Sequence, residues 1–271
     1  AGELHGSEEG VAGICLRGKP GWGENMAFVS TLVNTYGGRW FDEEWNPELN
    51  SEAWVNAIQF YVDLLNDYGP PGASSNGFNE NLALFSRGNC AMWVDATSAA
   101  GKLYDGNESD VADSLGFAPA PIAKTPKGSH WLWSWALAIP ASSENQEAAL
   151  EFITWATSQE YIELVGETEG WTSVPPGTRE STYANEQYTE AAPFADFVLK
   201  AIQDADPTDS TLEPNPYVGV QFVGIPEFQS IGTQVGQTIA AALTGDTTVE
   251  QALDSAQRAT ERTMQRAGYL D

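Results

Sequence analysis

Apolar residues recur along the chain at two different periods, and segments of the two kinds alternate. Helical spacing predicts four main helices, at about 24–36, 50–68, 143–156 and 247–268. Short apolar runs bounded by turn residues predict strands over 11–18 and 89–96. Strand-like and helical segments that follow one another in this way indicate an α/β fold.

Capping residues sharpen the expected starts of the later helices. Ser143 with Gln146, and Thr247 with Glu250, have the spacing of a capping box, in which two side chains satisfy free backbone groups at a helix start. Ser158 is expected to open a shorter helix. Glycine and proline residues end the first two helices.

A tryptophan-rich segment, "GSHWLWSWALAIP" at 128–140, alternates large and small side chains and predicts a strand. Trp131, Trp133 and Trp135 then share one face, and each indole offers roughly 150–250 Å² of surface. A patch of that size needs a cover, which is core, a partner or a ligand. Five other tryptophans are assigned to packing: Trp40, Trp45, Trp54, Trp93 and Trp155.

Two further tryptophans, Trp22 and Trp171, lie in loops beside glycines, a position typical of a ligand platform. Sugars and polyols complement an indole because they combine apolar C–H groups with hydroxyls. Glu24, Asn25 and Asp95 are candidates to bind those hydroxyls. For Asp95 an equal alternative is a helix N-cap, and both roles are compatible.

Acidic residues outnumber basic ones by 38 to 12, which gives a formal net charge of −26. Such a charge repels nucleic acid and anionic membrane surfaces, so neither is expected as a partner. The acids are scattered, which favours a solvated surface adapted to salt. Calcium binding is the weaker reading, because no acidic run has the ligand order of an EF-hand.

Cys15 and Cys90 allow one disulfide, or both are free buried thiols, and their spacing does not choose. With two histidines and no CxxC, we expect no metal site, and nothing calls for a cofactor. Catalytic motifs such as GxSxG, HExxH and GxGxxG are missing, so we expect no enzyme. The alternative is a carbohydrate-active enzyme or a lectin-like carbohydrate-binding module that uses the same tryptophans.

Five motifs in order resemble the extracellular solute-binding proteins of family 1, which serve ABC importers of sugars. They are "STLVNTYGGRWFDEE", "ALFSRGNCAMWVDATSAAG", "WALAIPASSENQEAALEFITWATSQEYIELV", "GWTSVPPGTRESTY" and "IAAALTGDTTVEQALDSAQRATERTM". The wording around "GICLRGKPGWGEN" and "HWLWSWALAIP" is most similar to the sorbitol/mannitol (polyol)-binding branch.

This resemblance implies a periplasmic-binding-protein-like (type II) fold of two α/β lobes that close on the ligand. By position, residues 1–130 begin the C-terminal lobe, 131–172 cross the hinge into the N-terminal lobe, and 173–271 return. Five residues are then expected to approach the cleft: Trp22, Asp95, Trp133, Trp135 and Trp171. Trp133 and Trp135 are favoured over Trp131.

The family's amino-terminal stretch, which builds most of its N-terminal lobe, has no counterpart in these 271 residues. Without it, the apolar face around Phe152 and Trp155 would be uncovered, and a dimer becomes an option. The resemblance further implies a small polyol or sugar ligand and the permease subunits of an ABC importer as partners. It places the protein in the periplasm or outside the cell, with tethering through a removed N-terminal segment as an option.

Overall fold

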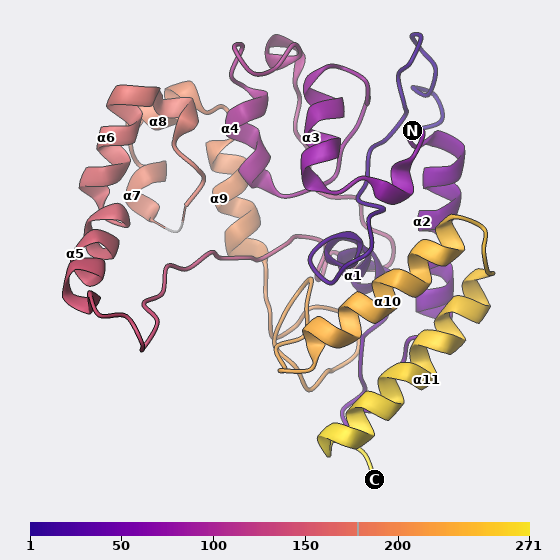
Figure 1. Ribbon diagram of the computed structural model, residues 1–271. Coiled ribbons are helices and arrows are strands. Elements are labelled where there is room, and N and C mark those ends of the chain that lie inside the picture. The colour runs from indigo at the N-terminus through magenta and orange to yellow at the C-terminus, as the bar shows by residue number, and fades with distance from the viewer. Residues whose placement is uncertain (178) are drawn as a thin grey trace. The chain divides into compact units, whose positions relative to one another are not determined.

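The computed structural model describes residues 1–177 and 179–271 (Figure 1). The chain divides into two compact units. Unit 1 comprises Ala1–Ala96, Ala118–Leu132 and Ala201–Asp271, and unit 2 comprises Thr97–Phe117 and Trp133–Lys200. The boundary between the units falls within the tryptophan-rich segment, because Trp131 belongs to unit 1 while Trp133 and Trp135 belong to unit 2.

Five of the described α-helices lie wholly in unit 1, and three of these are the longest in the described chain. The five are α1 (Asn25–Thr35), α2 (Glu52–Tyr68), α3 (Phe78–Ser86), α10 (Phe228–Leu243) and α11 (Val249–Ala267), with a short 3₁₀ turn at Ala73–Ser75. Helices α10 and α11 form an antiparallel pair that packs on α2, while α1 contacts α2 and α10 (Figure 1). Their inward faces build one continuous apolar core.

Aromatic side chains fill the centre of this core. Trp40 is 1% exposed, and its ring meets those of Trp54 and Phe228 edge-on at 5.0 and 5.1 Å. Both buried indoles donate their N–H: Trp40 to Ser30 Oγ at 3.3 Å and Trp54 to the Arg39 carbonyl at 2.8 Å. The predicted packing role of Trp40 and Trp54 is confirmed.

The predicted start of α11 is wrong by one residue. Thr248 is the N-cap, and its hydroxyl accepts a hydrogen bond from the backbone N–H of Gln251. The hydroxyl of Thr247 instead donates to the side-chain oxygen of Gln251 at 3.1 Å. Gly268 ends the helix with φ +82°, a left-handed conformation that glycine adopts without strain.

The capping box expected at Ser143 is also wrong. Helix α5 (Gln146–Ala156) has Asn145 at its N-cap, and the Gln146 side chain reaches back to the Ala141 carbonyl at 2.9 Å. Ser143 accepts only from the backbone N–H of Asn145 at 3.3 Å, before the helix begins. The start of α6 (Gln159–Glu169) is confirmed, because Ser158 accepts from the N–H of Tyr161.

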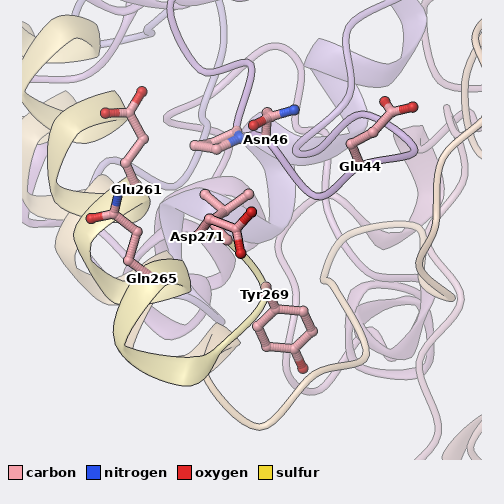
Figure 2. A pocket seen from close by; sticks show the side chains of 8 residues that line it. Glu44, Asn46, Glu261, Gln265, Tyr269 and Asp271 are labelled. Atoms are coloured by element: carbon pink, nitrogen blue, oxygen red, sulfur yellow. The ribbon is translucent and has the colours of Figure 1, made fainter.

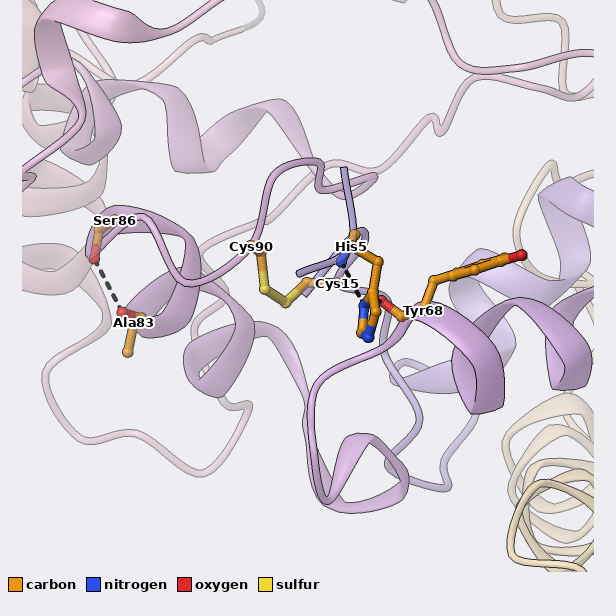
Figure 3. The surroundings of a disulfide bond; sticks show 7 residues. His5, Cys15, Tyr68, Ala83, Ser86 and Cys90 are labelled. Carbon is orange, nitrogen blue, oxygen red and sulfur yellow. Dashed lines mark hydrogen bonds between the residues drawn. A yellow bond between two sulfur atoms is a disulfide. The ribbon is translucent and has the colours of Figure 1, made fainter. Parts of the chain in front are cut away.

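The two predicted strands near residues 12 and 90 are reduced to isolated parallel bridges, Ala12 with Cys90 and Cys15 with Trp93. The structure joins Cys15 and Cys90 in a disulfide between these segments, with Cα atoms 5.9 Å apart (Figure 3). The α/β character of unit 1 therefore rests on extended segments that pair at single points, beside long helices.

The strand predicted over 128–140 is wrong: residues 131–140, all of them described, have no regular secondary structure. The backbone of Leu132 explains why. Its N–H donates to the Gln221 side-chain oxygen at 3.2 Å, and its carbonyl accepts from the Gln221 amide nitrogen at 3.1 Å. A buried glutamine side chain thus takes the place of a neighbouring strand.

The described helices of unit 2 are at most 11 residues long. Besides α5 and α6 they are α4 (Ala100–Leu103), α7 (Glu180–Tyr183), α8 (Glu186–Ala191) and α9 (Ala195–Asp204), with 3₁₀ turns at Thr97–Ala99, Ala112–Ser114 and Trp171–Ser173; α9 ends in unit 1. A small aromatic core pairs Tyr183 with Tyr188 at 5.9 Å.

Helix α5 carries large apolar side chains that are open to solvent. Leu150 and Phe152 are each 59% exposed and Trp155 is 39% exposed. Trp155 packs on Tyr161 at 4.8 Å, so its predicted packing role holds only in part. Among the described helices of both units, none combines the length and the apolar composition that crossing a bilayer requires.

Candidate functional site

Arg17 and Asp95 form a buried, two-pronged ion pair in unit 1. Arg17 donates from Nε to Asp95 Oδ2 at 2.9 Å and from Nη2 to Oδ1 at 2.7 Å, and the side chains are 10% and 2% exposed. Cys15 and Trp93 are bridged in parallel, so two residues further along each segment Arg17 and Asp95 lie level on the same face. This geometry is the strong, directional form of an ion pair.

The guanidinium of Arg17 also contacts residues from several other segments. Its Nη1 donates to the Gly23 carbonyl at 2.7 Å and lies 3.8 Å from Glu24 Oε2. Its Cζ is 5.3 Å from the Phe78 ring centroid and 4.9 Å from that of Trp131, both within cation–π range. We call Arg17, Asp95, Glu24, Phe78 and Trp131 the Arg17 cluster.

Sequence reasoning found two members of this cluster, Glu24 and Asp95, and missed Arg17. The available signal was a lone arginine inside the apolar run "GICLRG", in a chain with only 12 basic residues. A basic side chain at such a position is rarely buried without a partner. Pairing it with Asp95 would have required the parallel register, which the sequence does not show.

Asp95 was predicted either to bind hydroxyls or to cap a helix. Its Oδ1 accepts from the adjacent Ala96 N–H at 2.7 Å, but the next α-helix, α4, has Ala99 at its N-cap. The capping prediction is therefore wrong, because the carboxylate is engaged by Arg17 before the helix begins. Hydroxyl binding by Asp95 stays a prediction.

Trp22 is half-buried in a loop that rests on α10. A Cβ added to Gly232 would lie 2.8 Å from the Trp22 Cβ, so only glycine allows the loop to approach the helix this closely. Asn25 fixes the same loop: it is fully buried, accepts from the Gly21 N–H at 3.1 Å and donates to the Gly236 carbonyl at 2.9 Å. Asn25 is thus engaged within the protein and anchors the loop.

A pocket of about 740 Å³ opens beside Trp22 on the surface of unit 1. Its lining combines an indole with amide and hydroxyl side chains: Trp22, Pro226, Gln229, Ser230, Thr233, Gln234 and Gln237. An apolar ring face beside neutral hydrogen-bonding groups is the chemistry that a polyhydroxylated carbon chain requires.

Glu24 presents an acceptor that the described residues do not satisfy. Its Oε1 lies 3.4 Å from Lys19 Nζ, but its buried Oε2 accepts no hydrogen bond and is only within 3.8 Å of Arg17. A Cβ at Gly77 would lie 2.6 Å from this oxygen, so glycine leaves the space that Glu24 occupies. A hydroxyl donor would complete the coordination of Oε2.

The remaining predicted residues belong to unit 2. Trp133 and Trp135 lie together, with ring centroids 5.9 Å apart and edge-on, and their side chains are 43% and 89% exposed. Trp171 covers Gly166 of α6, where an added Cβ would collide with its indole ring at 2.6 Å. Ligand contact by these three tryptophans stays a prediction.

A second pocket, of about 460 Å³, lies at the end of α11 (Figure 2). Its lining is rich in carboxylates: Glu44, Asn46, Pro47, Glu261, Gln265, Tyr269, Leu270 and Asp271. Burial and the nearby negative charge of Glu227 raise the pKa of Tyr269 above its ordinary value. None of the predicted site residues lines this pocket.

The comparison with family models matches residues 1–163 to the bacterial extracellular solute-binding proteins. The chain belongs to this family, whose members are transport solute-binding proteins. The predicted family and the periplasmic solute-binding fold are both confirmed.

Individual relatives agree with this assignment. The chain is 58% identical over 269 residues to the mannitol-binding protein of Pseudomonas aeruginosa, covering 99% of this chain and 62% of that protein. A solute-binding protein from Agrobacterium vitis, solved with bound D-mannitol, is 57% identical with a TM-score of 0.97, covering 99% of this chain and 64% of that one. The chain therefore spans less than two thirds of the length of these relatives.

A more distant structure shares the fold alone. The solute-binding protein of Agrobacterium radiobacter in complex with ribitol is 24% identical, with a TM-score of 0.80, and the match covers 97% of this chain and 62% of that one.

Proposed function

We propose that the protein binds a sugar alcohol of the mannitol type and delivers it to the permease of an ABC importer. The observation that carries the proposal is the 58% identity to a mannitol-binding protein over 99% of the chain. The high TM-score to a mannitol-bound structure supports it. The family's location favours a periplasmic or extracellular protein.

The chemistry of unit 1 suits such a ligand. A polyol carries one hydroxyl on every carbon and a chain of C–H groups between them. The unsatisfied Oε2 of Glu24 can accept from a hydroxyl, the amides along α10 can donate or accept, and Trp22 offers an apolar face. A neutral ligand also avoids the repulsion that a net charge of −26 imposes on anions.

The lobe assignment is part of the same proposal. Residues 1–130 and 173–271 would supply the C-terminal lobe, and 131–172 would cross to the N-terminal lobe. Trp133, Trp135 and Trp171 would then add aromatic surface to the cleft, and closure around the polyol would create the form that docks on the permease.

Isothermal titration calorimetry of the intact protein tests the ligand class. D-mannitol, D-sorbitol and ribitol are titrated beside maltose, and the final mixtures are analysed for products. We expect saturable binding of a six-carbon polyol and its recovery unchanged. Binding of maltose in preference to every polyol, or conversion of the ligand, would contradict the proposal.

A further inference from the structure

We propose that Arg17 is a positioning residue of the polyol site, which holds the indole of Trp131 and the carboxylate of Asp95 in the arrangement that the ligand meets. This inference rests on the proposed function, and it adds Trp131 of unit 1 to the residues of the proposed site. Arg17 itself is not assigned a ligand contact, because each of its three guanidinium nitrogens already donates a hydrogen bond within the protein.

The hydrogen bonds of Arg17 leave its guanidinium little freedom. Nε and Nη2 are engaged by Asp95 and Nη1 by the Gly23 carbonyl, so the plane of the group is fixed by two different segments. An arginine makes this fork of parallel bonds because its donors are planar and rigid. A lysine at the same place has one nitrogen and cannot span the same partners.

The backbone beneath Arg17 is fixed as well. The hydroxyl of Tyr61, on α2, donates to the Arg17 carbonyl at 2.7 Å, and burial raises the pKa of this tyrosine so that it keeps its proton. Two residues earlier, Cys15 donates its N–H to the Met92 carbonyl at 2.8 Å and is bonded to Cys90. The side chain therefore projects from an anchored stretch of chain.

Trp131 is held in position through its ring and through the backbone of the next residue. The Arg17 Cζ lies over its ring at 4.9 Å, and the next residue, Leu132, is held through both backbone groups by Gln221. A ring that is already fixed loses little conformational entropy when a ligand stacks on it. By contrast, Trp135 is 89% exposed. Trp131 is thus the pre-arranged member of the tryptophan segment.

Unit 1 offers a matched control in Arg39. This arginine forms the same two-pronged pair with Glu48, at 2.8 and 3.0 Å, and also donates to a backbone carbonyl, that of Pro214. Its partners, Glu48 and Pro214, are outside the Arg17 cluster. Replacing Arg39 removes the same kinds of bond without touching the proposed site.

The binding test compares Arg17→Lys, Asp95→Asn, the double variant and Arg39→Lys by calorimetry with D-mannitol on the intact protein. We expect each of the first two to weaken binding at least about 10-fold, since charge-assisted hydrogen bonds are lost. The double variant should be no weaker than either single variant, because both break one unit. Arg39→Lys should stay within about 2-fold of wild type.

Two results of this test would overturn the inference: an Arg17→Lys affinity equal to that of Arg39→Lys, or effects of the two single changes that multiply in the double variant. A purely structural role would lower the thermal midpoints of Arg17→Lys and Arg39→Lys alike and leave the affinity of the folded protein unchanged.

A second readout needs no ligand. The indole ¹⁵N–¹H resonance of Trp131, assigned by its loss in Trp131→Phe, should shift in Arg17→Lys and stay in place in Arg39→Lys. If the wild type binds no polyol but this resonance shifts, the proposed function fails while the positioning of Trp131 by Arg17 stands. An unshifted resonance contradicts the inference whatever the protein binds.

Discussion

In unit 1, Trp40 and Trp54 lie in the helical core at 1% and 0% exposure, whereas in unit 2 Trp133 and Trp135 are 43% and 89% exposed. The buried pair is enclosed by long helices and donates both indole N–H groups. The exposed pair lies within an extended segment, residues 131–140, that has no regular secondary structure. Tryptophan thus stabilises the core of unit 1, whereas in unit 2 this pair forms part of the surface.

The difference teaches that burial depends on the neighbouring elements and not on the spacing of the tryptophans. In unit 1 the four helices α1, α2, α10 and α11 share one core, and the surface near Trp22 and the Arg17 cluster is fixed by hydrogen bonds. Unit 2 exposes Leu150 and Phe152 at 59% each. Four experiments with variants test this contrast between the units.

The largest expected effect is on the core of unit 1. Trp40→Ala should lower the free energy of unfolding by about 3–5 kcal/mol, because a large buried ring leaves a cavity. The matched change in unit 2, Trp155→Ala, should cost about 1 kcal/mol or less, since that ring is 39% exposed. Urea unfolding measures both, and equal losses would erase the contrast between the units.

The disulfide should have the next largest effect. Cys15 and Cys90 are 75 residues apart, and replacing both by serine should cost about 2–4 kcal/mol through the freer unfolded chain. Guanidinium unfolding with and without dithiothreitol provides the control. The reductant should lower the midpoint of the wild type and leave the double variant unchanged; an equal shift in both would refute the role of the bond.

A smaller and more local effect is expected at the contact between Trp22 and α10. Gly232→Ala should weaken mannitol binding about 10-fold, or about 1.4 kcal/mol, because the new methyl displaces the Trp22 loop. Alanine favours a helix interior, so the helix itself is not weakened. Gly245→Ala, at φ +78° with open space around it, should reduce stability and spare affinity. The reverse pattern would remove Trp22 from the site.

The smallest effect concerns the start of α3, which carries Phe78. Hydrogen bonds from backbone N–H groups, first that of Gly77 at 2.8 Å, lower the pKa of Glu80 below its ordinary value of 4.5. The stability that the Glu80 carboxylate adds to the folded state is therefore complete above pH 4.5. It is lost as the pH falls through the lowered folded-state pKa. This carboxylate is largely exposed, so the gain is slight.

Comparing acid unfolding of wild type and Glu80→Gln measures this contribution. The difference in stability between them should shrink as the pH falls below about 4. A difference that stays constant over the same range would show that the carboxylate has no part in it.

Much of unit 1 could be predicted because its helices have strong apolar periodicity and clear end signals. Helical spacing over 50–68 predicted α2, and Gly268 ends α11 at the expected position. The first residues of the helices were harder to predict. At α11 two neighbouring threonines are both possible N-caps, and only the geometry shows that Thr248 is the cap.

The extended segments were harder to predict from the sequence, since the residues that they contact are distant in the chain. Alternation over 128–140 was read as a strand, but the side chain of Gln221, 89 residues away, satisfies Leu132 instead. Arg17 was missed for the same reason, because its partner Asp95 is 78 residues away. Site residues that act through long-range pairs leave little trace in local pattern.

The most direct test of a polyol site in unit 1 is a D-mannitol titration of the intact protein with Trp22→Ala beside the wild type, each checked by thermal unfolding. We expect the wild type to bind mannitol and Trp22→Ala to bind it at least about 10-fold more weakly, with an unfolding midpoint within a few degrees of wild type. A Trp22→Ala protein that binds mannitol as tightly as the wild type would contradict the placement of the polyol site in unit 1.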